Sequence, residues 1–394
     1  MINLSQSPLF PRLPEELLIS LLAPPSTRSK PLRVVVDTDL DNEIDDFFAL
    51  VHLCLAQAAA EVQLEAIYAA PYSFRSRLLD MLQAMDLQKL PARVLSKPEQ
   101  DLVASYADQI NQIQQNLNLD PRSFLWPPEG APESAPPNAY DHVAIGPQVG
   151  MERSFTQARE LLDLIGSDTP LFKGANSYLQ NGCPVRSEAV DHLIDLARSA
   201  SSANPIYVIG LACATNLASA LLLAPDIRDK VVMTWTAGYP TNVTDLANTS
   251  FNLSQDVASA QVLFSSGVPL VYLPGFYIGQ QLTLSQPDIE HWFAGTGRIG
   301  AALAERYRQN PLFNWYGIDA NNLSGRIWNI WDLINGAWLV KPGSVASRLV
   351  RAPKLNDDRY WVPDPDGNWI RENTYTSYNS IFPDFVTRLA SFDT

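Results

Sequence analysis

A dense group of carboxylates stands near the amino terminus, in the segment VVVDTDLDNEIDDFFAL at residues 34–50. Six of the ten residues from Asp37 to Asp46 are acidic, although only 18% of the 394 residues are charged. Like charges crowded behind an apolar run destabilise a fold unless a cation offsets them. Carboxylate oxygens are also the preferred ligands of hard divalent cations. The segment therefore indicates either a well-hydrated acidic turn or a cation site.

The spacing of the first acids allows an EF-hand type of cation loop. Asp37, Asp39 and Asp41 stand at its first, third and fifth positions. However, Phe48 occupies the twelfth position, where that loop needs a bidentate glutamate, and a strand-like run precedes the loop instead of a helix. The EF-hand is therefore the weaker form of the cation hypothesis.

Two further interpretations remain open. A strand ending in DTD (37–39) resembles the motif of the haloacid dehalogenase phosphatases, whose first Asp attacks phosphorus, but the acids that follow here would repel a phosphate. Alternatively, Asp45 or Asp46 simply caps the next helix. Capping accounts for one or two of the six carboxylates.

Strand-like and helix-like segments alternate behind these residues. The β-branched run at 33–37 predicts a strand, and the good helix formers at 45–61 predict a helix. Further strands are predicted at 62–70, 91–95, 169–174, 205–211, 230–238 and 268–275, and further helices at 74–88, 99–119, 186–200, 215–225 and 254–267. This alternation predicts a doubly wound, Rossmann-like α/β fold, with a mostly parallel sheet covered by helices on both faces. Ligands bind such sheets at the carboxyl ends of the strands, where the acidic segment lies.

No break in composition forces a division into two domains. We expect an N-terminal arm at residues 1–30 and a single domain at 31–394. Seven prolines at 120–150 exclude regular structure there and predict a long loop or lid, or an inert surface insertion.

The bulk composition excludes several classes of partner. A formal net charge of −14 argues against nucleic acid or an anionic membrane as the main partner. No run reaches the roughly 18 continuous apolar residues that span a bilayer, and the first residues lack the pattern of a signal peptide. Cys54, Cys183 and Cys213 contain no CxxC spacing, which argues against a disulfide framework or a zinc site. We expect a soluble, cytoplasmic protein.

Four segments, in order, resemble the nucleoside hydrolases of the inosine–uridine-preferring type. The acidic segment resembles their strand–DxDPGxDDA–helix signature, with Pro-Gly replaced and two residues added, in a form similar to a divergent "NEIDD" branch. VIGLACATNLASALLLAPDIRDKVVMTWTAGYP, SFNLSQDVASAQVLF and NIWDLINGAWLVKPG resemble three later motifs. The resemblance covers roughly residues 33–345, and it implies a nucleoside hydrolase-like fold and a Ca²⁺ ion that holds a water and the ribose diol.

Matching the motifs residue by residue implies the ligands of that ion. Asp39 matches a calcium carboxylate that is also the general base, Asp46 and Asp332 match the other two carboxylates, and Leu211 matches a main-chain carbonyl ligand. Carboxylates, a carbonyl and waters suit a hard cation.

The same matching implies residues that hold the sugar. Asp45 matches a ribose hydroxyl ligand, Asn252 the Asn of the family's FN motif, and Asn242, more loosely, another sugar-side Asn. Ser250 replaces a family glutamate before FN, and Trp331 replaces a histidine that acts as leaving-group acid in part of the family. An indole cannot donate that proton, but it can stack on a flat base, so Trp331 favours a purine or another aromatic leaving group, or is a packing residue.

Other aromatic residues follow strands at the same edge of the predicted sheet. Tyr72, Phe74, Trp235 and Tyr239 could complete an aromatic pocket, although each taken alone is more typical of a core.

The leading hypothesis is a calcium-dependent hydrolase that cleaves the N-glycosidic bond of a ribonucleoside. The alternatives are a catalytically silent relative that binds Ca²⁺ and a riboside, and the phosphatase already described. The expected partner is a small nucleoside or riboside, with no nucleic acid and no membrane, and a homo-oligomer (dimer or tetramer) is left open.

Overall fold

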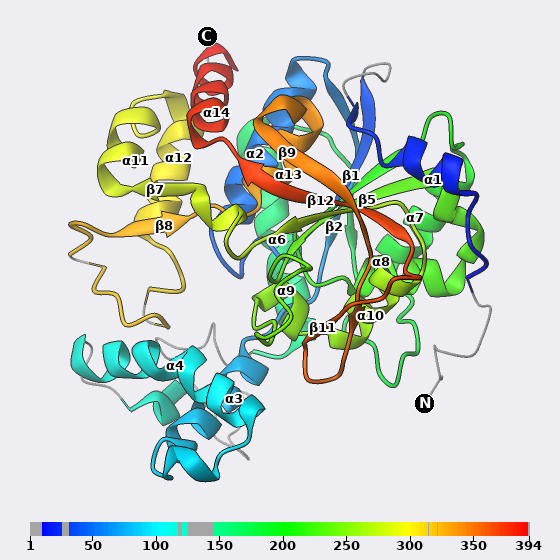
Figure 1. Cartoon of the computed structure of the whole chain (residues 1–394). Helices are drawn as coiled ribbons and strands as arrows, with labels where there is room; N and C mark the ends of the chain where they lie inside the picture. The colour runs from blue at the N-terminus through cyan, green and yellow to red at the C-terminus, as the bar shows by residue number, and fades with distance from the viewer. Residues whose placement is uncertain are drawn as a thin grey trace.

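An eight-stranded sheet forms the centre of the molecule, with strand order β3-β2-β1-β4-β5-β6-β12-β9 (Figure 1). The computed structural model describes residues 10–25, 31–116, 120–124, 145–313, 315–320 and 322–392. The strands are β1 (Leu32–Thr38), β2 (Val62–Ala69), β3 (Leu171–Lys173), β4 (Ile206–Gly210), β5 (Val231–Ala237), β6 (Leu270–Pro274), β9 (Val345–Arg351) and β12 (Trp369–Thr376). Within this sheet, as the structure describes it, only the pairing of β12 with β9 is antiparallel. The predicted α/β fold with a mostly parallel sheet is confirmed.

Helices cover both faces of the sheet, which explains why its central strands are mostly apolar and buried on both sides. Val34 and Val36 of β1 point to one face and Val35 to the other, and all three are fully buried. The first face is covered by α2 (Asp45–Ala58), α6 (Pro147–Ile165), α13 (Leu333–Val340) and α14 (Tyr378–Phe392). The second is covered by α7 (Glu188–Arg198), α8 (Thr215–Leu223) and α10 (Val257–Ser265).

The remaining elements complete the fold. They are α1 (Glu15–Leu21), α3 (Arg75–Leu87), α4 (Lys97–Asn116), α9 (Phe251–Ser254), α11 (Gln286–Trp292), α12 (Gly297–Arg308), the strands β7 (Thr283–Ser285), β8 (Ile327–Asn329), β10 (Lys354–Leu355) and β11 (Trp361–Val362), and the 3₁₀ turns η2 (Ala92–Val94), η3 (Pro121–Phe124), η4 (Pro225–Lys230), η5 (Gly279–Gln281) and η6 (Pro342–Ser344). In the N-terminal segment, α1 buries Leu18 and Leu21 in the core.

Two segments differ from the sequence expectation. The strand predicted at 91–95 is wrong, because Ala92–Val94 forms the exposed 3₁₀ turn η2, and a strand needs a pairing partner that this segment lacks. Residues 125–144, the greater part of the predicted loop or lid, lie outside the described residues, and α6 already begins at Pro147.

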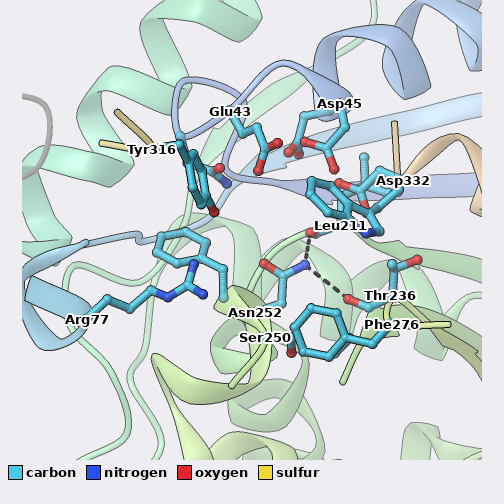
Figure 2. Close-up of a pocket in the computed structure, with 16 residues that line it drawn as sticks. Glu43, Asp45, Arg77, Leu211, Thr236, Ser250, Asn252, Phe276, Tyr316 and Asp332 are labelled. Atoms are coloured by element: carbon cyan, nitrogen blue, oxygen red, sulfur yellow. Dashed lines mark hydrogen bonds between the residues drawn. The ribbon is translucent and has the colours of Figure 1, made fainter. Parts of the chain in front are cut away.

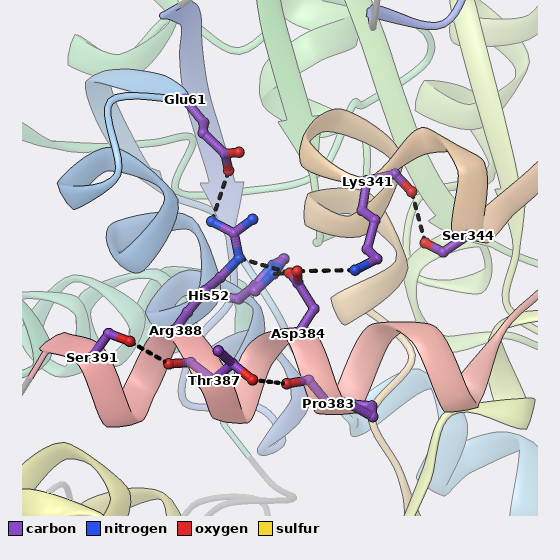
Figure 3. A network of polar contacts seen from close by, with 9 residues as sticks. All are labelled: His52, Glu61, Lys341, Ser344, Pro383, Asp384, Thr387, Arg388 and Ser391. Carbon is purple, nitrogen blue, oxygen red and sulfur yellow. Dashed lines mark hydrogen bonds and ion pairs between the residues drawn. The ribbon is translucent and has the colours of Figure 1, made fainter.

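A polar network fixes the C-terminal helix α14 to the body of the fold (Figure 3). The Asp384 carboxylate accepts hydrogen bonds from Arg388 Nε at 2.7 Å and from Lys341 Nζ at 3.1 Å. Arg388 Nη1 in turn lies 2.7 Å from a carboxylate oxygen of Glu61, next to β2. His52 of α2 is buried, with Nε2 3.9 Å from Asp384. The network joins α14 to the segments on either side of it.

Within the described ranges, no helix has both the length and the apolar character needed to cross a bilayer.

Candidate active site

A pocket opens at the carboxyl ends of β1, β4, β5 and β6, where a parallel sheet of this kind binds its ligand (Figure 2). Its empty volume is about 570 Å³, counting the solvent at its mouth. The lining residues are Asn42, Glu43, Asp45, Asp46, Arg77, Leu211, Thr236, Ala237, Ser250, Phe251, Asn252, Gly275, Phe276, Tyr316, Trp331 and Asp332.

Three buried carboxylates meet in the wall of this pocket. Asp45 and Asp46 stand in the first turn of α2, and Asp332 stands directly before α13. An oxygen from each lies within 4.8 Å of the other two. Helix amino termini favour negative charge, so both helices help to hold the acids there. The fold thus brings together Asp46 and Asp332, which are almost 300 residues apart in the sequence.

Burial and mutual repulsion disfavour the ionised forms of these acids. Burial, reinforced by the charge of Asp46, raises the pKa of Asp45 to about 8. Burial also raises the pKa of Asp46 to about 6, against the opposing hydrogen bond from Thr38. Burial followed by the charges of Asp45 and Asp46 raises the pKa of Asp332 well above its usual range. Without a cation, the cluster carries protons near neutral pH.

Asp39 is close enough to feel the same repulsion, but it is fully buried and does not line the pocket. Burial, followed by the charges of Asp46 and Asp45, raises the pKa of Asp39 well above its usual range. The side chain of Asn42 opposes this rise in pKa, but among the described residues neither carboxylate oxygen of Asp39 has a hydrogen bond of ordinary geometry.

The unsatisfied oxygens fit a cation better than any alternative the fold offers. Besides both oxygens of Asp39, Asp46 Oδ2 and Asp332 Oδ1 are buried without a hydrogen-bond partner in the part of the chain that the structure describes. Buried polar atoms are almost always satisfied in folded proteins, and a set made only of oxygens suits a hard cation. The cluster of Asp45, Asp46 and Asp332 could therefore hold a metal ion.

The side chain of Asn252 joins the ends of two strands beside this cluster. Its Nδ2 donates hydrogen bonds to the main-chain oxygens of Leu211, after β4, and Thr236, in β5, the latter at 3.0 Å. Ser250 also lines the pocket, and its Oγ accepts a hydrogen bond from Gly238 N at 2.7 Å. Leu211, Asn252 and Ser250 thus reach the pocket that the sequence analysis assigned to them.

The other predicted residues divide between the pocket and its surroundings. Trp331 lines the pocket beside Asp332. Asn242 is exposed in the loop after β5 and is not part of the lining. Of the proposed aromatic residues, Tyr72, Phe74 and Trp235 are buried outside the lining, and Tyr239 packs on the lining residue Phe276 with ring centroids 4.7 Å apart.

The remaining acids of the opening segment have structural partners. Asp37 Oδ1 accepts a hydrogen bond from Asn216 Nδ2 at 2.7 Å, and burial, opposed by this bond, raises the pKa of Asp37 to about 7. Asp41 accepts a hydrogen bond from the Tyr72 hydroxyl at 2.7 Å and lies 3.5 Å from Arg306 Nη2. These contacts fix the turn that leads from β1 into α2.

The pocket lining also contains residues to which the sequence assigned no role in the site, among them Glu43, Phe276, Arg77 and Tyr316. Glu43 had no assigned role, but it is buried in the pocket wall and accepts a hydrogen bond from Trp328 Nε1 at 2.6 Å. Phe276 follows β6, so the rule that ligands bind at strand ends could have found it. Arg77 and Tyr316 come from a helix and an irregular segment, and no spacing in the sequence points to them.

Comparison with known proteins identifies a family model that matches the chain. The family model described as inosine-uridine preferring nucleoside hydrolase matches residues 143–362, more than half of the chain. The uncharacterized protein C1683.06c of Schizosaccharomyces pombe is 27% identical over 238 residues, which cover 53% of this chain and 73% of that protein.

Two solved structures are similar over almost the whole chain. The purine-preferring ribonucleoside hydrolase from Gardnerella vaginalis has a TM-score of 0.57 at 16% identity, covering 92% of this chain and 99% of that one. The type III effector protein XopQ, complexed with adenosine diphosphate ribose, has a TM-score of 0.52 at 13% identity, covering 98% of each chain. At these identities the two structures establish the fold alone.

Proposed function

The chain belongs to the inosine-uridine preferring nucleoside hydrolase family, and we propose that it is a calcium-dependent hydrolase of the N-glycosidic bond of a ribonucleoside. The observation that carries the proposal is the group of buried carboxylate oxygens on Asp39, Asp46 and Asp332 that have no partner among the described residues. Membership of this family sets aside the phosphatase alternative.

We assign the ligands of the ion to Asp39, Asp46, Asp332 and the main-chain oxygen of Leu211. When bound, Ca²⁺ would hold the ribose diol and lower the pKa of the attacking water. Asp45 lies in the same cluster as Asp46 and Asp332, at the position from which it would bind a ribose hydroxyl.

Each remaining residue has a role that its surroundings support. Asp39, as a carboxylate, takes the proton of the attacking water on one of its two unsatisfied oxygens, which is the work of a general base. Asn252 spends its amide hydrogens on Leu211 and Thr236, so its Oδ1 is the atom left to accept a bond from the sugar. Trp331 and Phe276 offer flat faces for the leaving base. The surrounding acids stabilise the positive charge that develops on the ribose as the bond breaks.

Ser250 and Trp331 support a second candidate, a relative that binds Ca²⁺ and a riboside without turning it over. The Ser250 hydroxyl carries no charge and accepts a hydrogen bond from Gly238 N. The indole of Trp331 has no proton that it can transfer to a departing base. Tight binding of a nucleoside by calorimetry, with no product after hours, would favour this candidate.

The proposed reaction is tested by the release of reducing sugar from a panel of purine and pyrimidine ribonucleosides. Release that requires Ca²⁺, stops in EDTA and is lost in Asp39→Asn supports the proposal. Full activity in EDTA or in Asp39→Asn refutes it. Asp41→Asn is a matched control, because Asp41 is in the same loop but bonds to Tyr72 and Arg306 instead of lining the pocket.

A further inference from the structure

One side of the pocket carries a positively charged side chain that has no role in the proposed hydrolysis. Arg77, in the first turn of α3, lines the pocket together with Tyr316. Figure 2 shows these two residues on one side of the pocket and Phe276 on the other, with Asn252 between them. The carboxylates of Asp45 and Asp332 lie away from Arg77 in the same view.

Neutral groups hold the Arg77 guanidinium in place. Nη2 donates a hydrogen bond to the main-chain oxygen of Thr249 at 3.2 Å, and the hydroxyl groups of Tyr106 and Tyr316 are further hydrogen-bond partners. The guanidinium carbon lies 5.8 Å from the centre of the Phe251 ring. These contacts fix the direction of the side chain and leave its charge in place.

Within the described residues, the charge of Arg77 has no counterion in contact. Among the residues that the structure describes, no carboxylate forms an ion pair with Arg77, and its buried Nε has no hydrogen-bond partner. Glu43 is near enough for the Arg77 charge to act on it, but this is the least of the effects on that carboxyl group. A partly buried guanidinium is normally paired with an anion, because desolvation of an unpaired charge is costly.

We propose that Arg77 binds a phosphate ester on the riboside, so that the pocket prefers a ribonucleoside 5′-monophosphate to the unphosphorylated nucleoside. This inference rests on the proposed function, which places the 2′ and 3′ hydroxyls at the acidic cluster and the base against Trp331 and Phe276. The remaining substituent of the ribose is C5′, and Arg77 and Tyr316 form the side of the pocket that neither the diol nor the base uses. A guanidinium matches a phosphate with two parallel hydrogen bonds.

The test measures binding of ribose and ribose 5-phosphate by calorimetry in the presence of Ca²⁺, because neither sugar has a bond for the protein to cleave. The wild type is expected to bind ribose 5-phosphate roughly 10- to 100-fold more tightly than ribose, the range for a hydrogen bond to a charged group. Arg77→Gln is expected to lose this preference, and Arg77→Lys to keep part of it.

Two controls separate the anion site from a packing role and from the proposed reaction. Arg75→Gln removes an exposed arginine from the same helical turn and is expected to keep the preference, and thermal melting checks that each variant is folded. The inference is overturned if the wild type shows no preference, if neither sugar binds, or if folded Arg77→Gln retains the preference. If the protein hydrolyses inosine but shows no preference for the phosphate, this inference alone is overturned. If the preference depends on Arg77 but neither inosine nor its 5′-monophosphate is hydrolysed, the inference is supported and the result counts against the proposed function.

Discussion

Calcium is expected to stabilise this protein in a way that depends on pH, because the site carboxylates are protonated without it. In the fold, the pKa values are about 8 for Asp45 and 6 for Asp46 in the cluster, and about 7 for the neighbouring Asp37, against 3.8 for an ordinary aspartate. Above pH 4, these three groups therefore hold more protons in the metal-free folded protein than in the unfolded chain. Their contribution to the stability of the metal-free protein falls as the pH rises from about 4 to about 8. Calcium binds the ionised carboxylates, so its stabilising effect grows as these groups lose their protons, between about pH 6 and pH 8.

The size of the effect follows from linkage. A ligand at 100 times its dissociation constant that binds only the folded state adds about 2.7 kcal/mol to the free energy of unfolding. The entropy of unfolding of a chain of 394 residues is roughly 0.8 kcal/mol/K at about 2 cal/mol/K per residue, so the melting temperature rises by about 3 °C. Asp45→Asn removes one uncompensated charge and is expected to make the metal-free protein about 1–3 kcal/mol more stable than the wild type at pH 8. Asp46→Asn removes a proposed ligand of the ion and is expected to lose the response to calcium.

The assay is differential scanning calorimetry from pH 5 to pH 8, in EGTA and in excess calcium. Magnesium serves as the control ion, and Asp41→Asn as the control variant that keeps the calcium response. A calcium shift of the same size at every pH would contradict the reasoning. So would a metal-free Asp45→Asn protein that melts below the wild type at pH 8.

Three further changes test other parts of the account. Trp331→Ala is expected to lower kcat/KM for a purine nucleoside about 10-fold by loss of stacking, with Trp331→Phe near the wild type; steady-state rates that are equal for all three would exclude a stacking role. Asn252→Asp removes the donor to the Leu211 carbonyl and should cost about 1–3 kcal/mol in stability and weaken calcium binding, measured by melting and by calorimetry; unchanged calcium affinity would separate Asn252 from the site. Asp384→Asn should cost about 1 kcal/mol at pH 7, because the part-exposed Asp384 loses its bonds to Arg388 and Lys341. The hydrogen bond from His52, followed by those from Arg388 and Lys341, lowers the pKa of Asp384. The contribution of Asp384 to stability is therefore full above pH 4 and is lost as the pH falls through the pKa of the folded state; a melting difference that stays constant on acidification would contradict this.

Local patterns predicted most of the sheet, because its central strands are short apolar runs that alternate along the chain with helix-forming segments. The segment at 91–95 has the composition of a strand but forms η2, since pairing depends on a partner and not on composition. The pairing of β12 with β6 and β9 was not predicted either. The pairing of β12 with β6 joins segments of the chain about 100 residues apart, and no local pattern encodes that contact.

The acidic part of the site could be predicted from the sequence, because its residues belong to local units or motifs. Asp45 and Asp46 belong to one strand–turn–helix unit, and Asp332 carried the resemblance of its own motif. Arg77 and Tyr316 reach the same pocket only through the packing of α3 and of the segment around residue 316, so their types and spacing gave no signal. The part of the pocket most informative about its ligand is thus the part that only the fold reveals.

The central claim is that one calcium ion and the ribose diol share the acidic cluster, and a crystal structure grown with Ca²⁺ and a nucleoside tests it most directly. The account predicts one ion in contact with Asp39, Asp46, Asp332 and the main-chain oxygen of Leu211, with the ribose hydroxyls on the same ion and Asp45 beside them. An ion bound elsewhere, or a nucleoside bound with its base instead of its ribose against these carboxylates, would contradict it.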